Sequence, residues 1–341
     1  MKTLPQMPSL AAALRQAWGS GSLLIALSGI GGAYLALLFS GYGTWLATGK
    51  TWREAVGLGG AFPLILPDSG SPWPLQMALL LPLLALLHLA TGYALSRHFA
   101  AKLSGAPPGA WHRTFPLAFP GMLSMLGALG LQVFILGLLS FLIALLLLPG
   151  LIPVVGKWLI WPLLLAALPL ALLLLGVLIW LGTGLFLIPV IVGMGGEDAL
   201  GGAYHSLAAL VRIPLATLGQ IIKSLLVFGG LLSATVLTGL GVGRGLWYLW
   251  QHLYPGFGPL LKQVLFGMVP QLNLILGGLG ATPEALPATA VFLFLMMLIA
   301  LGAVLIAALV SMNWHLWCVA TLRLYRKMTG ESLIGNRPDD H

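Results

Sequence analysis

Four side chains inside apolar stretches of the sequence could do chemistry within a membrane: His88, Gln132, Lys223 and His315. A buried imidazole can bind a transition metal or haem iron, or exchange a proton near neutral pH. A buried amide or ammonium group can hold the polar part of a solute. A haem or metal protein with His88 and His315 as ligands is therefore one alternative.

A structural role is favoured for each of these residues. His88 is expected to be a neutral ring that faces protein, and Gln132 to bond across to a neighbouring helix. His315 and Lys223 are expected near the cytoplasmic boundary, with their polar ends reaching the headgroups. His315 and Cys318 lie three residues apart on one helical face, but two ligands do not make a zinc site. We therefore expect no metal and no cofactor.

The acidic residues argue against catalysis within the membrane. All 8 Asp and Glu residues fall outside the apolar stretches. A membrane metallopeptidase needs a glutamate between two histidines on one helix, and an aspartyl protease needs two facing carboxylates. Phosphate-loop glycine patterns are also absent from the sequence. We therefore expect that the protein is not an enzyme.

The elements that carry these residues are membrane helices. Of the 341 residues, 59% are hydrophobic and 7% are charged, whereas soluble domains carry roughly 25% charged residues. About 20 apolar residues in helical form cross the hydrocarbon core with every backbone hydrogen bond satisfied. The sequence predicts an all-α membrane protein with spans at about 22–46, 75–95, 122–147, 158–191, 215–240 and 291–317.

The fourth of these segments is longer than a bilayer requires. It contains Pro162, Pro169 and Pro189, which remove backbone donors and can kink a membrane helix. A tilted and bent helix is therefore expected.

The basic residues predict the orientation of the spans. The alternate connections divide the 16 Lys and Arg residues into 11 on one side and 5 on the other. Positive charge is retained in the cytoplasm, so both termini are expected to be cytoplasmic in a multi-pass protein of the inner membrane. This distribution indicates topology determinants, and no nucleic acid is expected as a partner.

Three aromatic residues suggest an internal repeat. Trp18, Trp111 and Tyr204 are spaced by 93 residues, and each precedes an odd-numbered span. This spacing favours three helical hairpins, each preceded by a short cytoplasmic interfacial helix, with units 1–103, 104–195 and 196–341 in one membrane domain covering 1–341. Coincidence is the alternative, since aromatic residues are common at membrane interfaces.

The connection at 241–289 is rich in aromatic and apolar residues. Trp247, Tyr248 and Trp250 form a cluster, and apolar residues recur at helical spacing over 260–269. This pattern predicts a helix in the outer interface or over the outer end of the bundle. An interfacial lid without a ligand is favoured over a lid that closes on a solute.

Two segments resemble a known family. The run from Glu197 to Leu207, with sequence EDALGGAYHSL, is similar to the entry into a span in bacterial six-span proteins of the YciC type. It also resembles the membrane domain attached to some glycerophosphodiester phosphodiesterases. The segment from Leu322 to Lys327, followed by Gly330, is similar too, whereas Tyr204 to Ser206 depart from the pattern. The resemblance implies a six-span fold but no residue motif for a reaction.

These observations favour a non-enzymatic membrane component, namely a scaffold, assembly factor or regulatory partner of another membrane protein. The bilayer and other membrane proteins are the expected partners. A carrier for a lipid or another amphipathic solute is the first alternative, and the histidine-based haem or metal protein is the second.

Overall fold

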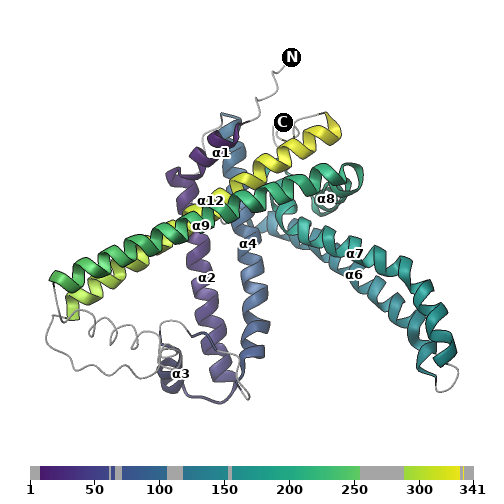
Figure 1. The fold of residues 1–341 in the computed structure, drawn as a ribbon, viewed down its shortest axis with the longest axis horizontal. Helices are drawn as coiled ribbons and strands as arrows, with labels where there is room; N and C mark the ends of the chain where they lie inside the picture. The colour runs from purple at the N-terminus through teal and green to yellow at the C-terminus, as the bar shows by residue number, and fades with distance from the viewer. Residues whose placement is uncertain are drawn as a thin grey trace. The chain divides into compact units, whose positions relative to one another are not determined.

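The structure of the protein is a computed structural model that describes residues 8–60, 63–65, 71–105, 118–152, 156–253, 288–330 and 333. All the regular elements of this part of the chain are helical (Figure 1). They are α1 (Leu10–Ala17), α2 (Ser20–Ala47), α3 (Trp52–Gly59), α4 (Trp73–Leu103), α6 (Ala118–Leu147), the 3-10 turn η1 (Leu148–Leu151), α7 (Gly156–Gly195), α8 (Ala199–Arg212), α9 (Pro214–Leu253) and α12 (Ala288–Thr329).

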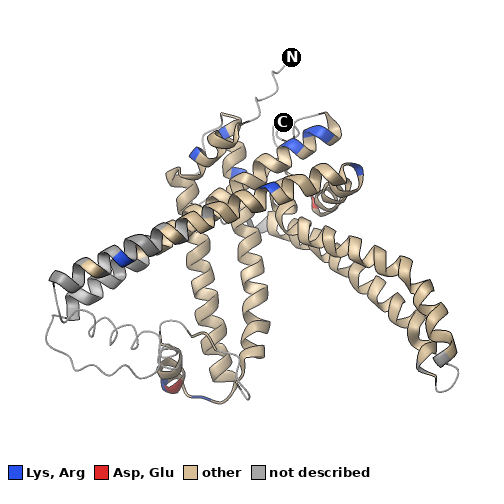
Figure 2. Cartoon of the chain, in the orientation of Figure 1, with Lys and Arg blue, Asp and Glu red and all other residues tan. Residues whose placement is uncertain are grey.

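Six helices of the described residues are long and apolar enough to cross a membrane: α2, α4, α6, α7, α9 and α12. The predictions of an all-α fold and of six apolar helices are thus confirmed. The helices extend beyond the predicted spans, because helical hydrogen bonding continues after the apolar stretch ends. Basic residues mark several of these ends, with Lys102 in the last turn of α4 and Arg326 and Lys327 in that of α12 (Figure 2).

The helix that carries the fifth span continues past the predicted end of that span. Residues 241–253 continue α9 instead of starting a separate interfacial helix, so Trp247 and Trp250 lie on the same helix as Lys223. The glycines near 241 weaken a helix without breaking it, and the first proline after Pro214 is Pro255. The predicted helix over 260–269 lies outside the described residues.

The fourth span is one helix despite its prolines. α7 continues through Pro162, Pro169 and Pro189 from Gly156 to Gly195. The hairpin of α6 and α7 curves along its length (Figure 1), as expected for a helix whose prolines remove backbone hydrogen bonds.

Short helices precede two of the odd-numbered spans. α1 is capped by the Ser9 hydroxyl at its N-terminus and is followed by Trp18 as its C-cap residue. α8 is capped by the Asp198 carboxylate, which accepts from Gly201 N–H at 2.7 Å. Tyr204 lies on α8. Trp111 lies outside the described residues, so the threefold repeat stays a prediction.

α3 is a helix that the sequence analysis missed. The Thr51 hydroxyl accepts from Glu54 N–H, and the Glu54 carboxylate accepts from Thr51 N–H at 2.8 Å. The two hydrogen bonds that Thr51 donates lower the pKa of the Glu54 carboxyl. The Thr-x-x-Glu spacing of this capping box is visible in the sequence and could have revealed the helix.

The chain divides into two compact units, one made of residues 1–22, 89–226 and 312–341 and the other of 23–88 and 227–311. In the second unit the Gln76 amide fixes an irregular segment, because it donates to Pro63 O at 2.6 Å and accepts from Ile65 N–H at 2.7 Å. Tyr42 donates to Gly60 O in the same region.

The core of the first unit joins α4, α6, α7 and α8. Its buried members include Tyr93 of α4, Met125 of α6 and Ala203 of α8. Trp180 of α7 lies among them and donates to the Ser206 hydroxyl of α8 at 2.9 Å. This core holds the N-terminal part of α6 and the C-terminal part of α7 in place. It supports the sites described below.

Candidate functional site

α12 carries a buried face of aromatic and polar residues in the first unit. The sixth span has 67% of its most apolar 18-residue window buried, the highest share of the six. Trp314 lies against Gly92 of α4, where a Cβ would stand 2.3 Å from the indole ring. Trp317 stacks on Phe186 of α7, with ring centroids 4.7 Å apart. Two bulky rings thus tie the last span to α4 and α7.

A small polar cluster lies beside these rings. The Cys318 thiol donates to the Ser96 hydroxyl at 3.5 Å, and Ser96 donates to Gly92 O at 2.6 Å. The Cys318 side chain is fully buried. These two hydrogen bonds satisfy the polar groups buried between α12 and α4. Their role is to hold the two helices together.

His315 lies in the interior of the first unit, and its predicted position at the headgroup level stays a prediction. Its side chain is fully buried and meets the Phe99 ring edge to face at 5.1 Å. α12 continues beyond His315 to Thr329, about 20 Å further along the helix axis.

Gln132 is buried in the α6–α7 hairpin, but the predicted cross-helix hydrogen bond is not formed. Its amide lies against Gly184 of α7, where a Cβ would stand 2.7 Å from both amide atoms. Neither amide atom has a hydrogen-bond partner within the described ranges. α7 presents a residue without a side chain at this position, so no polar group faces the amide.

The other two candidates are His88 and Lys223. His88 is half-buried on α4 and is the last residue of its segment of the second unit, whereas His315 belongs to the first. Lys223 is exposed on α9. The part of the chain that the structure describes contains no group of three or more His, Cys, Asp or Glu residues that could hold a metal ion.

The interfacial aromatic residues that the structure describes are exposed. Trp18 and Tyr204 are each more than half exposed, and Arg212 donates to the Tyr204 hydroxyl at 2.9 Å. Tyr248 is exposed on α9. Trp247 and Trp250 lie on the same helix, but the structure does not describe their side chains.

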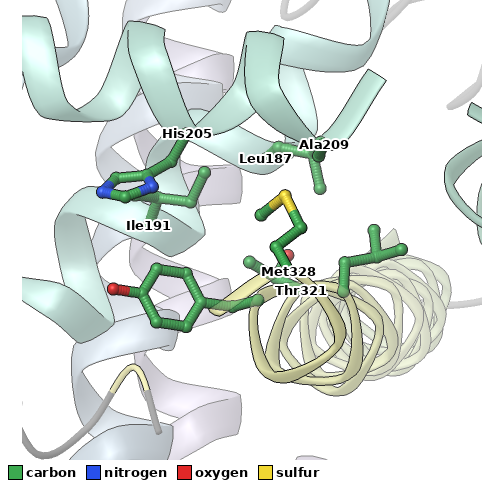
Figure 3. A pocket seen from close by; sticks show the side chains of 8 residues that line it. Leu187, Ile191, His205, Ala209, Thr321 and Met328 are labelled. Atoms are coloured by element: carbon green, nitrogen blue, oxygen red, sulfur yellow. The ribbon is translucent and has the colours of Figure 1, made fainter. Parts of the chain in front are cut away.

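A pocket lies where α7, α8 and α12 meet (Figure 3). It is a shallow and partly open space, and its empty volume of about 210 Å³ includes solvent outside the protein. Its lining consists of Leu187, Ile191, His205, Ala209, Thr321, Leu324, Tyr325 and Met328. Sequence analysis missed this site, although residues 321, 324, 325 and 328 share one face of a helix.

The polar groups of the pocket come from α8 and α12. His205 Nε2 lies 3.6 Å from Glu197 Oε1, and the His205 ring lies 5.2 Å from that of Tyr325. Thr321 is 3% exposed, and its hydroxyl has no hydrogen-bond partner among the described residues.

No family model, curated protein or solved structure matches the chain. The class of protein therefore rests on the fold itself. In the described ranges six helices are long and apolar enough to cross a membrane, so the chain is a multi-pass α-helical membrane protein in contact with the lipid bilayer.

Proposed function

We propose that this chain is a non-enzymatic component of the cytoplasmic membrane that scaffolds, assembles or regulates another membrane protein. Both termini face the cytoplasm in this proposal. The observation that carries it is an exposed face of α6 on which glycine and phenylalanine repeat every seven residues.

The face is formed by Gly130, Phe134, Gly137 and Phe141. The two phenylalanines are 67% and 62% exposed. A Cβ built on either glycine meets no atom within 4 Å. Each glycine therefore leaves an open depression next to a projecting ring.

This pattern is better suited to contact with a helix of another protein than to contact with lipid alone. Lipid tails cover any apolar surface, whereas helices in a membrane associate through close packing at small residues. A seven-residue repeat keeps the same face turned to a partner that crosses at a small left-handed angle. The rings would enter spaces on the partner, and the partner's side chains would fill the depressions at Gly130 and Gly137.

The burial of the spans supports the same conclusion. The third and fourth spans have 6% and 11% of their most apolar windows buried, against 67% for the sixth. Few residues of these two windows are buried by the described part of the chain, which leaves the α6–α7 hairpin surface for a partner helix in this proposal.

The test is to replace Gly130 and Gly137 together with isoleucine. Photo-crosslinking from position 133 in native membranes should capture a partner with the parent chain, and the double variant should reduce the yield about tenfold, since bulk at both glycines prevents close packing. Gly219→Ile on α9 is the matched control, because a Cβ there also meets nothing within 4 Å. An unchanged yield with the double variant would contradict the proposal.

A lipid or amphipathic-solute carrier is the second candidate, and in it an acyl chain would lie against the apolar side chains where α7, α8 and α12 meet. Ala209→Trp places an indole among the apolar walls and should reduce labelling of Tyr325 and Met328 by a photoreactive phospholipid about fivefold. Leu215→Trp, at a highly exposed position of α9, serves as the control. Equal labelling of the two variants would remove the carrier from consideration.

A further inference from the structure

The turn between α1 and α2 presents unpaired backbone donors. α1 ends at Ala17 and α2 begins at Ser20. Gly19 N–H and the Ser22 hydroxyl both donate to Gln16 O, at 3.0 and 3.1 Å, which fixes the turn. The first N–H groups of α2 have no acceptor within the helix, and they carry the positive end of its dipole.

A lysine from α4 lies beside this turn. A Cβ built on Gly19 would stand 2.9 Å from Lys102 Nζ, so the ammonium group comes close to the backbone where α2 begins. Among the described residues, His205 forms an ion pair with Glu197. No carboxylate of the described residues forms an ion pair with Lys102. The ammonium and the N-terminus of α2 therefore add their positive potentials.

A buried histidine of α4 also lies beside the N-terminus of α2. His98, one turn before Lys102 on α4, is 6% exposed, and its ring lies against Gly21. A Cβ on Gly21 would stand 3.0 Å from His98 Nε2. This nitrogen has no hydrogen-bond partner in the described part of the chain, and a buried polar atom without a partner is costly.

Both glycines are needed for this arrangement. Any side chain at Gly19 or Gly21 would occupy the space that Lys102 or His98 fills. The N-terminus of α2, a cation and a buried imidazole nitrogen thus converge on one small region, and each can donate to an oxyanion.

We propose that the N-terminus of α2, Lys102 and His98 form a binding site for a phosphate group. Phosphate oxygens accept hydrogen bonds from helix N-terminal N–H groups and from lysine, and negative charge is stabilised by the helix dipole. His98 donates from Nε2–H. The exposed Trp18 next to the turn is suited to the headgroup level of a membrane, so the phosphate belongs to an anionic phospholipid or to free phosphate.

The experiment uses the full-length protein purified in detergent, with binding measured by native mass spectrometry. The probes are phosphatidic acid, diacylglycerol with the same acyl chains, and inorganic phosphate alone. The parent protein is expected to bind phosphatidic acid about tenfold more tightly than diacylglycerol, as one charge-assisted interaction of this kind implies.

Lys102→Gln should remove most of this preference, whereas Lys223→Gln removes the same charge from an exposed site on α9 and should leave it unchanged. His98→Phe keeps a ring against Gly21 but removes Nε2, and it should also weaken the preference. His98→Phe decides the outcome if Lys102→Gln proves unstable on thermal unfolding.

Binding of inorganic phosphate alone would identify a free-phosphate site, and binding of phosphatidic acid only would identify a lipid headgroup site. Both outcomes support the phosphate site. Equal binding of diacylglycerol and phosphatidic acid, or an unchanged preference in the substituted proteins, would overturn it.

Discussion

Replacing Trp317 with alanine is expected to lower the free energy of unfolding by about 3–5 kcal/mol, the range for large aromatic truncations in a packed core. Trp317 is 1% exposed and stacks on Phe186 with an interplanar angle of 15°. Removing the indole leaves a cavity between α12 and α7 that the surrounding helices can only partly close. Unfolding by sodium dodecyl sulfate, followed by circular dichroism, measures the change.

Two further variants separate the cavity from other effects of the substitution. Trp161→Ala removes an indole that is 73% exposed on α7 and should change stability by less than about 1 kcal/mol. Trp317→Phe should stay within about 1 kcal/mol of the parent, because it keeps a stacked ring and removes a buried indole N–H that has no partner among the described residues. A loss as large in Trp161→Ala as in Trp317→Ala would show that the last span is not held in this way.

Gly92→Ala is expected to destabilise the protein by about 1–3 kcal/mol, the usual cost of overpacking a core. The added methyl group would stand 2.3 Å from one atom of the Trp314 ring and 2.4 Å from another. Trp314 is itself buried, so the ring cannot move aside without displacing its neighbours on α4 and α7. The same detergent titration measures the change.

The matched control is Gly176→Ala on α7, in the same unit. A Cβ on Gly176 meets no atom within 4 Å, so this variant should be neutral or slightly stabilising through its better helix propensity. Similar stabilities for the two alanine variants would contradict the packing of Trp314 on Gly92.

The sequence predicted the six apolar helices correctly because the length and polarity of a span are local properties. An apolar run of about 20 residues satisfies its backbone as a helix whatever its neighbours are. The helix ends were less accurate, as α9 shows by continuing past Gly241 to Leu253. The resemblance to the YciC type, the threefold repeat and the orientation of the termini stay predictions.

The sequence also identified the residues that merit attention without showing what they contact. Gln132 was expected to find a polar partner, but α7 places Gly184 opposite it. His315 was expected at the interface, and it lies buried against Phe99. His98 lies beyond the predicted end of the second span, and only the structure shows that its ring is packed on Gly21.

By itself, then, the sequence determined the class of fold and the helices that cross the membrane. The tertiary structure alone decided which helix faces meet, including the contacts of Lys102 with Gly19 and of Trp314 with Gly92. In a soluble protein, an apolar stripe in the sequence indicates which face of a helix is buried, whereas these spans are apolar all round. The choice of face is made by the fit of bulky side chains against glycines on other helices, and that fit depends on residues far apart in the chain.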